Sequence, residues 1–232
     1  MKKAVLLVLL CLLFSLKTNA QEACCINLSA NQIMSAAVTH TRENDRLKQA
    51  RLIYNEVSTQ KEFNYKGDKL SAKEEAETID GLRSRLAGFD LSIGELLQIL
   101  VVKHQFSEPE EVILNNKSYW LINFYPKSGL IDNTTENKFL NRLQGKIWLD
   151  VQNNSLWRVE AQISESRAFS FRTWKLLGLV PIHVKSFKLT FQQIEYMGIM
   201  VENSIQVEAK YVVLSETRTR KYDFQYSNYR LK

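Results

Sequence analysis

The sequence has 232 residues, of which 45% are hydrophobic and 24% are charged, with 31 Lys and Arg against 25 Asp and Glu. This composition is typical of a globular protein, and it excludes a largely disordered chain or one made of membrane spans. Eight Gly and three Pro exclude collagen-like and Pro-rich proteins and leave little material for Gly-rich phosphate loops. Three His and three Cys do not favour a cluster of metal ligands.

The first 20 residues have the parts of a secretory signal peptide. Lys2 and Lys3 precede an apolar run over 4–16, and Thr18-Asn19-Ala20 supplies a small residue for cleavage. The run is too short to cross a hydrocarbon core about 30 Å thick. We therefore expect cleavage after Ala20 and export to a bacterial periplasm or out of the cell.

Cleavage would remove three lysines and lower the net charge from +6 to +3. A charge this small favours solubility and gives no sign of nucleic-acid binding. Cys24 and Cys25 would be the two remaining cysteines. Adjacent cysteines rarely pair with each other because the ring is strained, so we expect them to have no role in the fold. In an oxidising compartment they could instead bridge two chains.

The first half of the mature chain begins with the pattern of a helix and then a strand. Asn31 can cap a helix that carries apolar residues over 33–38. A strand is predicted over 52–65, and it ends in the turn Lys66-Gly67-Asp68.

Two further helices are predicted after this turn. Ser71 and Glu74 have the spacing of a capping box for a polar helix over Ala72–Ala87, and Gly88 is placed as its C-cap. A much more apolar helix follows over Leu91–Val102, and such a helix needs an apolar surface to lie on.

Beyond Glu111 the chain has mainly the pattern of β-strands. The clearest alternation places Trp157, Val159 and Ile163 on one face of a strand. The predicted segments are Val112–Tyr125 paired around Asn115-Asn116-Lys117, a short helix or loop over Thr134–Leu143, and strands over Gly145–Asp150, Leu156–Ser164, Ala168–Trp174, Val184–Ile194, Ile199–Val213 and Glu216–Tyr229.

Long strands joined by tight turns form an antiparallel meander, whose apolar face must be closed or covered. We therefore predict an α+β fold with a curved antiparallel sheet, an incomplete β-barrel, covered by two or three helices. We expect one domain over 21–232, rich in helix over 29–105 and mainly β over 111–232.

The sequence shows no arrangement of residues typical of catalysis. His40, His104 and His183 lie in three different predicted elements, and no cysteine lies in the body of the fold. A G-x-S-x-G elbow, a phosphate loop and an EF-hand spacing are all missing from the sequence. We predict a protein that is not an enzyme, without cofactor or metal, in which the histidines have structural or surface roles.

Large apolar side chains recur on successive predicted strands, and they either fill a core or line a cavity between sheet and helices. The sequence alone leaves both interpretations open. Aromatic walls suit acyl chains, so we predict a hydrophobic ligand. The residues predicted to bind it are Leu96, Leu97 and Leu100 of the apolar helix, Trp120, Phe124, Trp148, Trp157, Phe187, Phe191 and Tyr222 of the strands, and Arg218.

Two features indicate contacts at the edge of such a cavity. Arg218 and Arg220 share a strand face with Tyr222, where they can meet a carboxylate or phosphate group, although ordinary edge-strand charges are the alternative. The segment Leu176–Ile182 is an apolar stretch predicted to be a loop, which is either buried or docks on a membrane or a protein.

Gly145-Lys-Ile-Trp-Leu-Asp150, followed after a turn by Leu156-Trp-Arg-Val-Glu160, resembles a hairpin common in the outer-membrane lipoprotein-sorting (LolA-like) superfamily. The final strand, with Tyr222-Asp-Phe-Gln-Tyr-Ser-Asn-Tyr229, is similar to exported bacterial members of that group. The resemblance covers about 111–232. It implies an incomplete barrel closed by helices, with a hydrophobic cavity that holds lipid or acyl groups in the family. No ligand residue is carried over, because no carrier-specific motif is matched.

Two functions follow as hypotheses. The first is a periplasmic protein that binds or carries an acyl chain, a lipid or a lipoprotein in a cavity between sheet and helices. The second is an envelope sensor or protein-interaction module that uses the same fold without a ligand. A hydrolase would need polar groups that converge in the cavity, and the sequence does not show such a set.

Overall fold

The structure of the protein is a computed structural model that describes residues 28–80, 92–175 and 178–232. The predicted signal peptide over 1–20, together with Cys24 and Cys25, lies outside the described residues. Among the residues that are described, no helix has the length and apolar character needed to cross a membrane.

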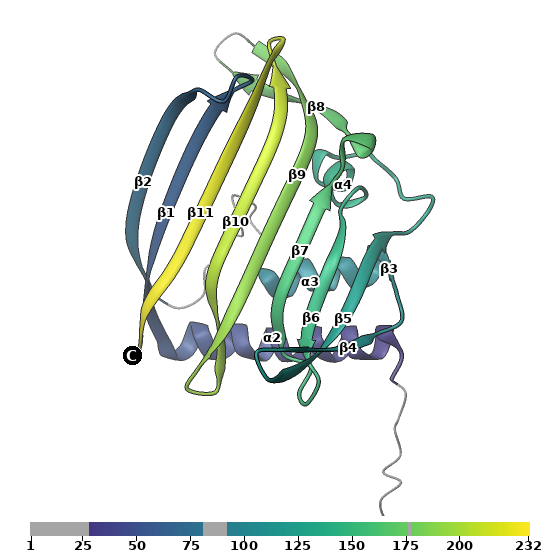
Figure 1. Ribbon diagram of the computed structural model, residues 1–232, viewed down its shortest axis with the longest axis vertical. Coiled ribbons are helices and arrows are strands. Elements are labelled where there is room, and N and C mark those ends of the chain that lie inside the picture. Colours follow the sequence, from purple (N-terminus) through teal and green to yellow (C-terminus); the bar gives the residue numbers. More distant parts are fainter. Residues whose placement is uncertain (1–27, 81–91, 176–177) are drawn as a thin grey trace, which may run out of the picture.

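Eleven strands of the described residues form one antiparallel sheet, in the order β2-β1-β11-β10-β9-β7-β6-β5-β3, with β4 paired to β5 and β8 paired to β9 (Figure 1). The strands are β1 (Leu52–Asn64), β2 (Lys69–Asp80), β3 (His104–Phe106), β4 (Glu110–Leu114), β5 (Lys117–Pro126), β6 (Gln144–Asp150), β7 (Leu156–Ile163), β8 (Phe169–Lys175), β9 (Gly178–Tyr196), β10 (Ile199–Val213) and β11 (Glu216–Leu231). The sheet is curved and is not closed. This confirms the predicted α+β fold with an incomplete barrel.

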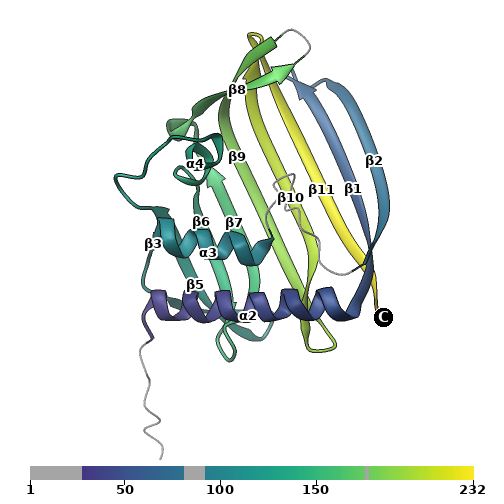
Figure 2. The ribbon, with the colours of Figure 1, turned by 180° about the vertical axis from the view of Figure 1, so that it is seen from behind.

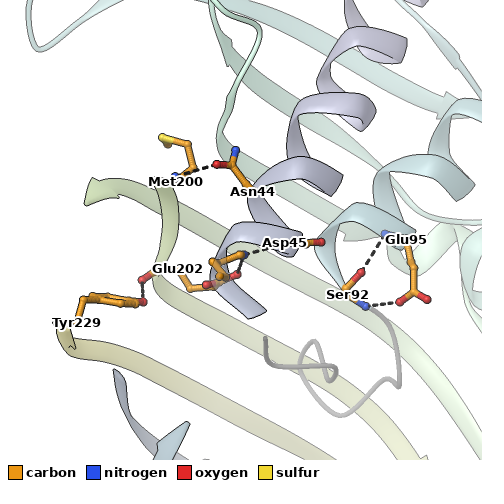
Figure 3. Close-up of polar contacts among 8 residues, drawn as sticks. Asn44, Asp45, Ser92, Glu95, Met200, Glu202 and Tyr229 are labelled. Carbon is orange, nitrogen blue, oxygen red and sulfur yellow. Dashed lines mark hydrogen bonds and ion pairs between the residues drawn. The ribbon is translucent and has the colours of Figure 1, made fainter. Parts of the chain in front are cut away.

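Three α-helices occur in the described parts of the chain: α2 (Ala30–Arg51), α3 (Ile93–Lys103) and α4 (Thr135–Leu140). Helix α2 begins after Ser29, two residues before the predicted cap, because Ser29 and Gln32 form a capping box. Ser92 and Glu95 form the same reciprocal pair of hydrogen bonds at the start of α3 (Figure 3).

Helix α2 lies across one end of the long strands, and α3 lies beside α2, nearer to the shorter strands β5, β6 and β7 (Figures 1 and 2). We call the face of the sheet that they cover the inner face and the opposite one the outer face. The two helices and the inner face enclose the main hydrophobic core, which confirms that the helices cover the sheet. Its most deeply buried members include Ile33, Met34, Ala37, Leu97, Leu100, Ile122, Phe124, Ile147, Val159 and Phe191.

A buried ion cluster fastens α2 to the sheet. The Lys48 ammonium has no exposed surface, and it lies 2.9 Å from Asp45 Oδ1 and 2.6 Å from Glu202 Oε1 of β10. Burial alone would lower the pKa of Lys48, but the two carboxylates outweigh it and raise the pKa above its usual value. The backbone of Gly94 in α3 also hydrogen-bonds to Asp45, so the cluster joins two helices and a strand.

Two hydrogen bonds extend this attachment along the sheet (Figure 3). The backbone N–H of Met200 donates to Asn44 Oδ1 at 3.3 Å, and the Tyr229 hydroxyl donates to the backbone oxygen of Glu202. Burial raises the pKa of Tyr229 above its usual value, so its hydroxyl stays protonated as a donor.

The polar helix predicted over Ala72–Ala87 is wrong where the structure describes it. Residues Lys69–Asp80 form β2, which pairs with β1 along its length. The turn at Gly67, with a φ of +90°, folds the chain back so that β1 can supply the hydrogen bonds of β2. Tertiary pairing therefore overrides the helix propensity of an Ala- and Glu-rich segment. Residues 81–87 lie outside the described part.

The predicted apolar loop over Leu176–Ile182 is largely strand. Leu176 and Leu177 lie outside the described residues, and β9 already begins at Gly178. Its first residues pair with β8, where Phe171 lies opposite Ile182. Strand β9 is therefore longer than predicted, because the apolar segment continues the ladder as half of a hairpin.

Candidate functional site

Under the helices, the inner face is a packed core. Leu97 and Leu100 of α3 are fully buried, and Leu96 is 6% exposed. Phe124 and Phe191 of the sheet are fully buried in the same cluster. Five residues that were predicted to bind a ligand are thus brought together as closely packed neighbours, and their contact with a ligand stays a prediction.

Beyond the helices, the apolar side chains of the inner face are only half buried. We call this patch the aromatic surface, and it consists of Phe171, Val184, Ala209, Tyr222 and Phe224. The rings of Tyr222 and Phe224 stack with their centroids 6.3 Å apart and their planes at 9°. Figure 2 shows α2 crossing the opposite end of the long strands, and α3 lying beside it, nearer to β5, β6 and β7. Neither helix therefore covers the aromatic surface.

The aromatic surface continues directly into the core. Phe224 lies opposite Ile205 of β10, and Ile205 lies opposite Phe191 of β9. Directly opposed residues of antiparallel strands share a face, with their Cβ atoms about 5 Å apart. Phe187 marks the border, since it is buried and its ring meets Phe139 of α4 edge to face at 4.8 Å. An acyl chain bound on this face would thus contact a continuous apolar surface.

A cluster of charged and hydroxyl groups bounds the aromatic surface at the end away from α2. We call it the Glu62 cluster, and it consists of Glu62 of β1, Tyr211 of β10 and Arg218 and Arg220 of β11. The Tyr211 hydroxyl donates to Glu62 Oε1 at 2.5 Å. Both guanidinium groups lie 3.5 Å from a Glu62 oxygen. The cluster shares the inner face, because Arg220 lies opposite both Glu62 and Ala209.

The electrostatics of the Glu62 cluster keep its carboxylate ionised. Burial by itself would raise the pKa of Glu62, but the hydrogen bond from Tyr211 and the charges of Arg220 and Arg218 outweigh it and lower that pKa. Burial and the hydrogen bond to Glu62 raise the pKa of Tyr211 to about 12. The cluster therefore holds two cations, one anion and a neutral phenol at neutral pH.

The predicted tryptophans lie on different faces. Trp120 is half buried against the core on the inner face. Trp148 lies on the outer face, with the Arg158 guanidinium 5.6 Å from the centre of its ring. Trp157 stacks on Tyr119, also on the outer face, at 4.5 Å. The structure therefore does not place Trp148 and Trp157 with the other predicted residues.

Trp157 was predicted to share a strand face with Val159, and an irregular register in β7 explains why it does not. Trp148 lies opposite Arg158, whereas the next residue, Leu149, lies opposite Leu156. Trp157 is thus an extra residue that the ladder skips, as in a β-bulge. The alternation predicted for Leu156–Ser164 holds from Val159 onward but not at Trp157.

Of the residues of this region, Tyr222, Arg218 and Arg220 were predicted from the sequence to lie on one strand face, whereas Glu62 and Tyr211 were not predicted as site residues. Glu62 lies in a predicted strand, and nothing in its local pattern distinguishes it from a solvated charge. Its importance comes from the pairing of β1 with β11, strands from the two ends of the chain. A glutamate at an apparently inner position of a strand is the only signal that could have indicated it.

Two hollows of about 320 and 390 Å³ lie over the outer face, and they share Lys188 and Thr190. The rest of their lining is mainly polar and charged side chains of the outer face. Such a lining does not suit an acyl chain.

His104 is buried, and its Nε2 lies 2.9 Å from the backbone oxygen of Leu143. Its structural role agrees with the prediction. Among the described residues, no three His, Cys, Asp or Glu side chains are grouped as metal ligands would be.

Acidification is expected to destabilise the protein through His104. Burial, with smaller contributions from Lys103 and Lys127, lowers the pKa of His104 below 6.5. The unfolded chain then binds more protons than the folded one below about pH 6.5, so stability is lost as the pH falls, by at most about 1.4 kcal/mol per pH unit. Urea unfolding of the wild type and of His104→Gln between neutral and mildly acidic pH measures this. The glutamine keeps a donor for Leu143 but cannot titrate, so an equal pH slope in both proteins would contradict the prediction.

No protein-family model matches the chain, and a search of curated proteins found no match. Solved structures do match it. They include a LolA superfamily protein from Nitrosomonas europaea, with 11% identity, a TM-score of 0.37 and coverage of 88% of this chain and 94% of that one. A putative outer membrane lipoprotein-sorting protein domain from Vibrio parahaemolyticus has 12% identity, a TM-score of 0.38 and coverage of 86% and 93%. MucB in the Pseudomonas aeruginosa MucA/MucB complex has 10% identity, a TM-score of 0.30 and coverage of 85% and 94%. The first two of these proteins are named for the group that the Gly145 hairpin resembles.

Proposed function

We propose that this protein binds an acyl chain or a lipid, free or attached to a lipoprotein, on the aromatic surface, as a non-enzymatic protein of the periplasm. The observation that supports this most directly is the partly buried pair of stacked rings, Tyr222 and Phe224, on the inner face of an open sheet. Exposed apolar patches that continue into a core are characteristic of ligand-binding and docking sites.

The energy available from this surface is large enough for stable binding. Burying one methylene group contributes about 0.8 kcal/mol, so ten methylenes would contribute about 8 kcal/mol before the costs of association. The signal peptide predicted over 1–20 supports the compartment, since exported proteins meet lipids and lipoproteins in the envelope.

Native mass spectrometry of the protein purified from its own envelope fraction, combined with organic extraction, tests this function. We expect a mass shift that disappears on extraction and an acyl or lipid species in the extract. A clean mass together with no binding of added fatty acid would overturn the proposal.

Replacing Phe224 with serine is expected to weaken the binding of a fatty acid about tenfold, because burying a phenylalanine contributes about 1.5–3 kcal/mol. Displacement of a fluorescent apolar probe measures the affinity. Val57→Ser is the matched control, since half-buried Val57 lies on the outer face between Glu56 and Ser58, which oppose the inner residues Tyr226 and Phe224. Equal losses in the two variants would show that the site lies elsewhere.

One observation favours a protein-interaction role as a second candidate. Strand β2 ends the order of the sheet, and its side chains are exposed from Lys69 to Thr78. An open edge can accept a strand from a partner protein, although charged edge residues usually oppose such pairing. Protection of the β2 amides from hydrogen exchange by a co-purifying protein would favour this role.

A further inference from the structure

We infer that the ligand of the aromatic surface is an anionic amphiphile, whose carboxylate or phosphate head binds the Arg220 guanidinium. This inference rests on the proposed function and adds the chemistry of the ligand's head. It follows from the position of Arg220, from its incomplete hydrogen bonding and from the charge around it.

Arg220 stands where the head of a bound chain would lie. It follows Phe224 and Tyr222 along the inner side of β11, at successive alternate positions. Two residues along a strand span about 7 Å, so the backbone of Arg220 lies one such step beyond that of Tyr222, and its Nη1 lies 3.4 Å from the Tyr222 hydroxyl. A chain that lies over the stacked rings with its head toward the Glu62 cluster would bring that head to Arg220.

Not all N–H donors of the Arg220 guanidinium have a hydrogen-bond partner in the described residues. A guanidinium carries five N–H donors. Its Nη1 donates to the Tyr222 hydroxyl at 3.4 Å, and its Nη2 lies 3.5 Å from Glu62 Oε2. Its Nε has no hydrogen-bond partner among the described residues, although it is buried. The side chain as a whole is 34% exposed, so an oxyanion can reach it.

The positive charge of Arg220 is also only partly balanced by neighbouring carboxylates. Glu62 is a single carboxylate between two guanidinium groups. Arg218 has a second partner, Glu216, at 2.7 Å, whereas no second ion pair involves Arg220 in the described residues. On strand β2, which pairs with the strand of Glu62, the charge of Lys73 is matched by Glu75 at 2.5 Å. An oxyanion at Arg220 would therefore balance the remaining positive charge and accept charge-assisted hydrogen bonds.

The test compares dodecanoate, dodecanol and dodecyl phosphate, which share one tail and differ in the head. Isothermal titration calorimetry with the full chain at neutral pH gives the three affinities. We expect the two anions to bind about tenfold more tightly than the alcohol, because hydrogen bonds to charged groups are the stronger ones. Arg220→Gln should remove this preference and leave the affinity for dodecanol unchanged.

Two further variants separate this effect from misfolding or from loss of overall charge. Glu62→Gln removes the carboxylate that competes for Arg220, so it should strengthen anion binding several-fold without affecting dodecanol. Lys221→Gln removes one positive charge from the outer side of the same strand, beside Glu208, and should keep the preference of the wild type.

The outcomes distinguish the two proposals. If no dodecyl compound binds the wild type, the proposed function fails. If dodecanol binds as tightly as dodecanoate, the function stands and the inference about the head is overturned. If inorganic phosphate displaces dodecanoate at an equal concentration, the site binds free anions, and the amphiphile is again overturned.

Discussion

Replacing Lys48 with methionine is expected to lower the free energy of unfolding by about 3–5 kcal/mol. The change would leave Asp45 and Glu202 buried and facing each other without the ammonium that now lies within 2.9 Å of both. Burial already raises the pKa of Asp45, so removing the cation would raise it further. Urea unfolding measures the loss, and hydrogen exchange of the α2 amides shows whether the helix detaches from the sheet.

Two comparisons make this prediction specific. Arg46 pairs with Glu43 on the exposed side of the same helix, at 2.7 Å, so Arg46→Met should cost less than about 1 kcal/mol. Adding Glu202→Gln to Lys48→Met should restore part of the stability, because only one buried carboxylate then stays unpaired. If Lys48→Met costs no more than Arg46→Met, the buried cluster does not hold α2 on the sheet.

Replacing Gly145 with alanine is expected to cost about 3 kcal/mol and to disturb the hairpin of β6 and β7. A Cβ atom at this position would lie 1.9 Å from the backbone oxygen of Glu160 and 2.9 Å from the Cα of Ala161. A clash with backbone cannot be relieved by rotating a side chain, so the strands must move apart. Thermal unfolding measures the loss.

Gly129→Ala is the matched control for that substitution. Gly129 has a φ of +76° and no atom within 4 Å of the added Cβ, so its replacement introduces strain without a clash. We expect it to cost about 1 kcal/mol. Similar losses in both variants would show that the close approach of β6 and β7 is not what requires glycine at position 145. The close approach of the two strands is also a physical reason for the glycine at the start of this hairpin, the one that resembles a hairpin of the LolA-like superfamily.

Much of the fold could be predicted where local chemistry decides it. Asn115 and Asn116 both adopt positive φ angles, 52° and 61°, in the hairpin turn predicted at that position. The apolar helix predicted over Leu91–Val102 is α3, and its leucines enter the core. These features depend on neighbours in the sequence, so the pattern of a few residues is enough to predict them.

The candidate site could be predicted only in part, because its residues come from distant strands. Tyr222 and Arg218 belong to one strand, and their alternation shows that they share a face. Glu62 joins them only through the register of β1 against β11. No local pattern contains that register, just as none shows the skipped residue at Trp157.

Local patterns in the sequence were enough to predict the helices that carry apolar faces, most of the strands beyond Glu111, the turns between them and the resemblance of the Gly145 hairpin. Spacing, capping and turn preferences act over a few residues, which is why they can be read locally. Three features depend on long-range contacts instead: residues 69–80 form a strand, Leu97 and Phe191 fill the core, and Tyr222 and Phe224 stay partly exposed. Burial and strand pairing depend on which distant segment covers a side chain, and neither α2 nor α3 reaches the end of β10 and β11 that lies away from α2.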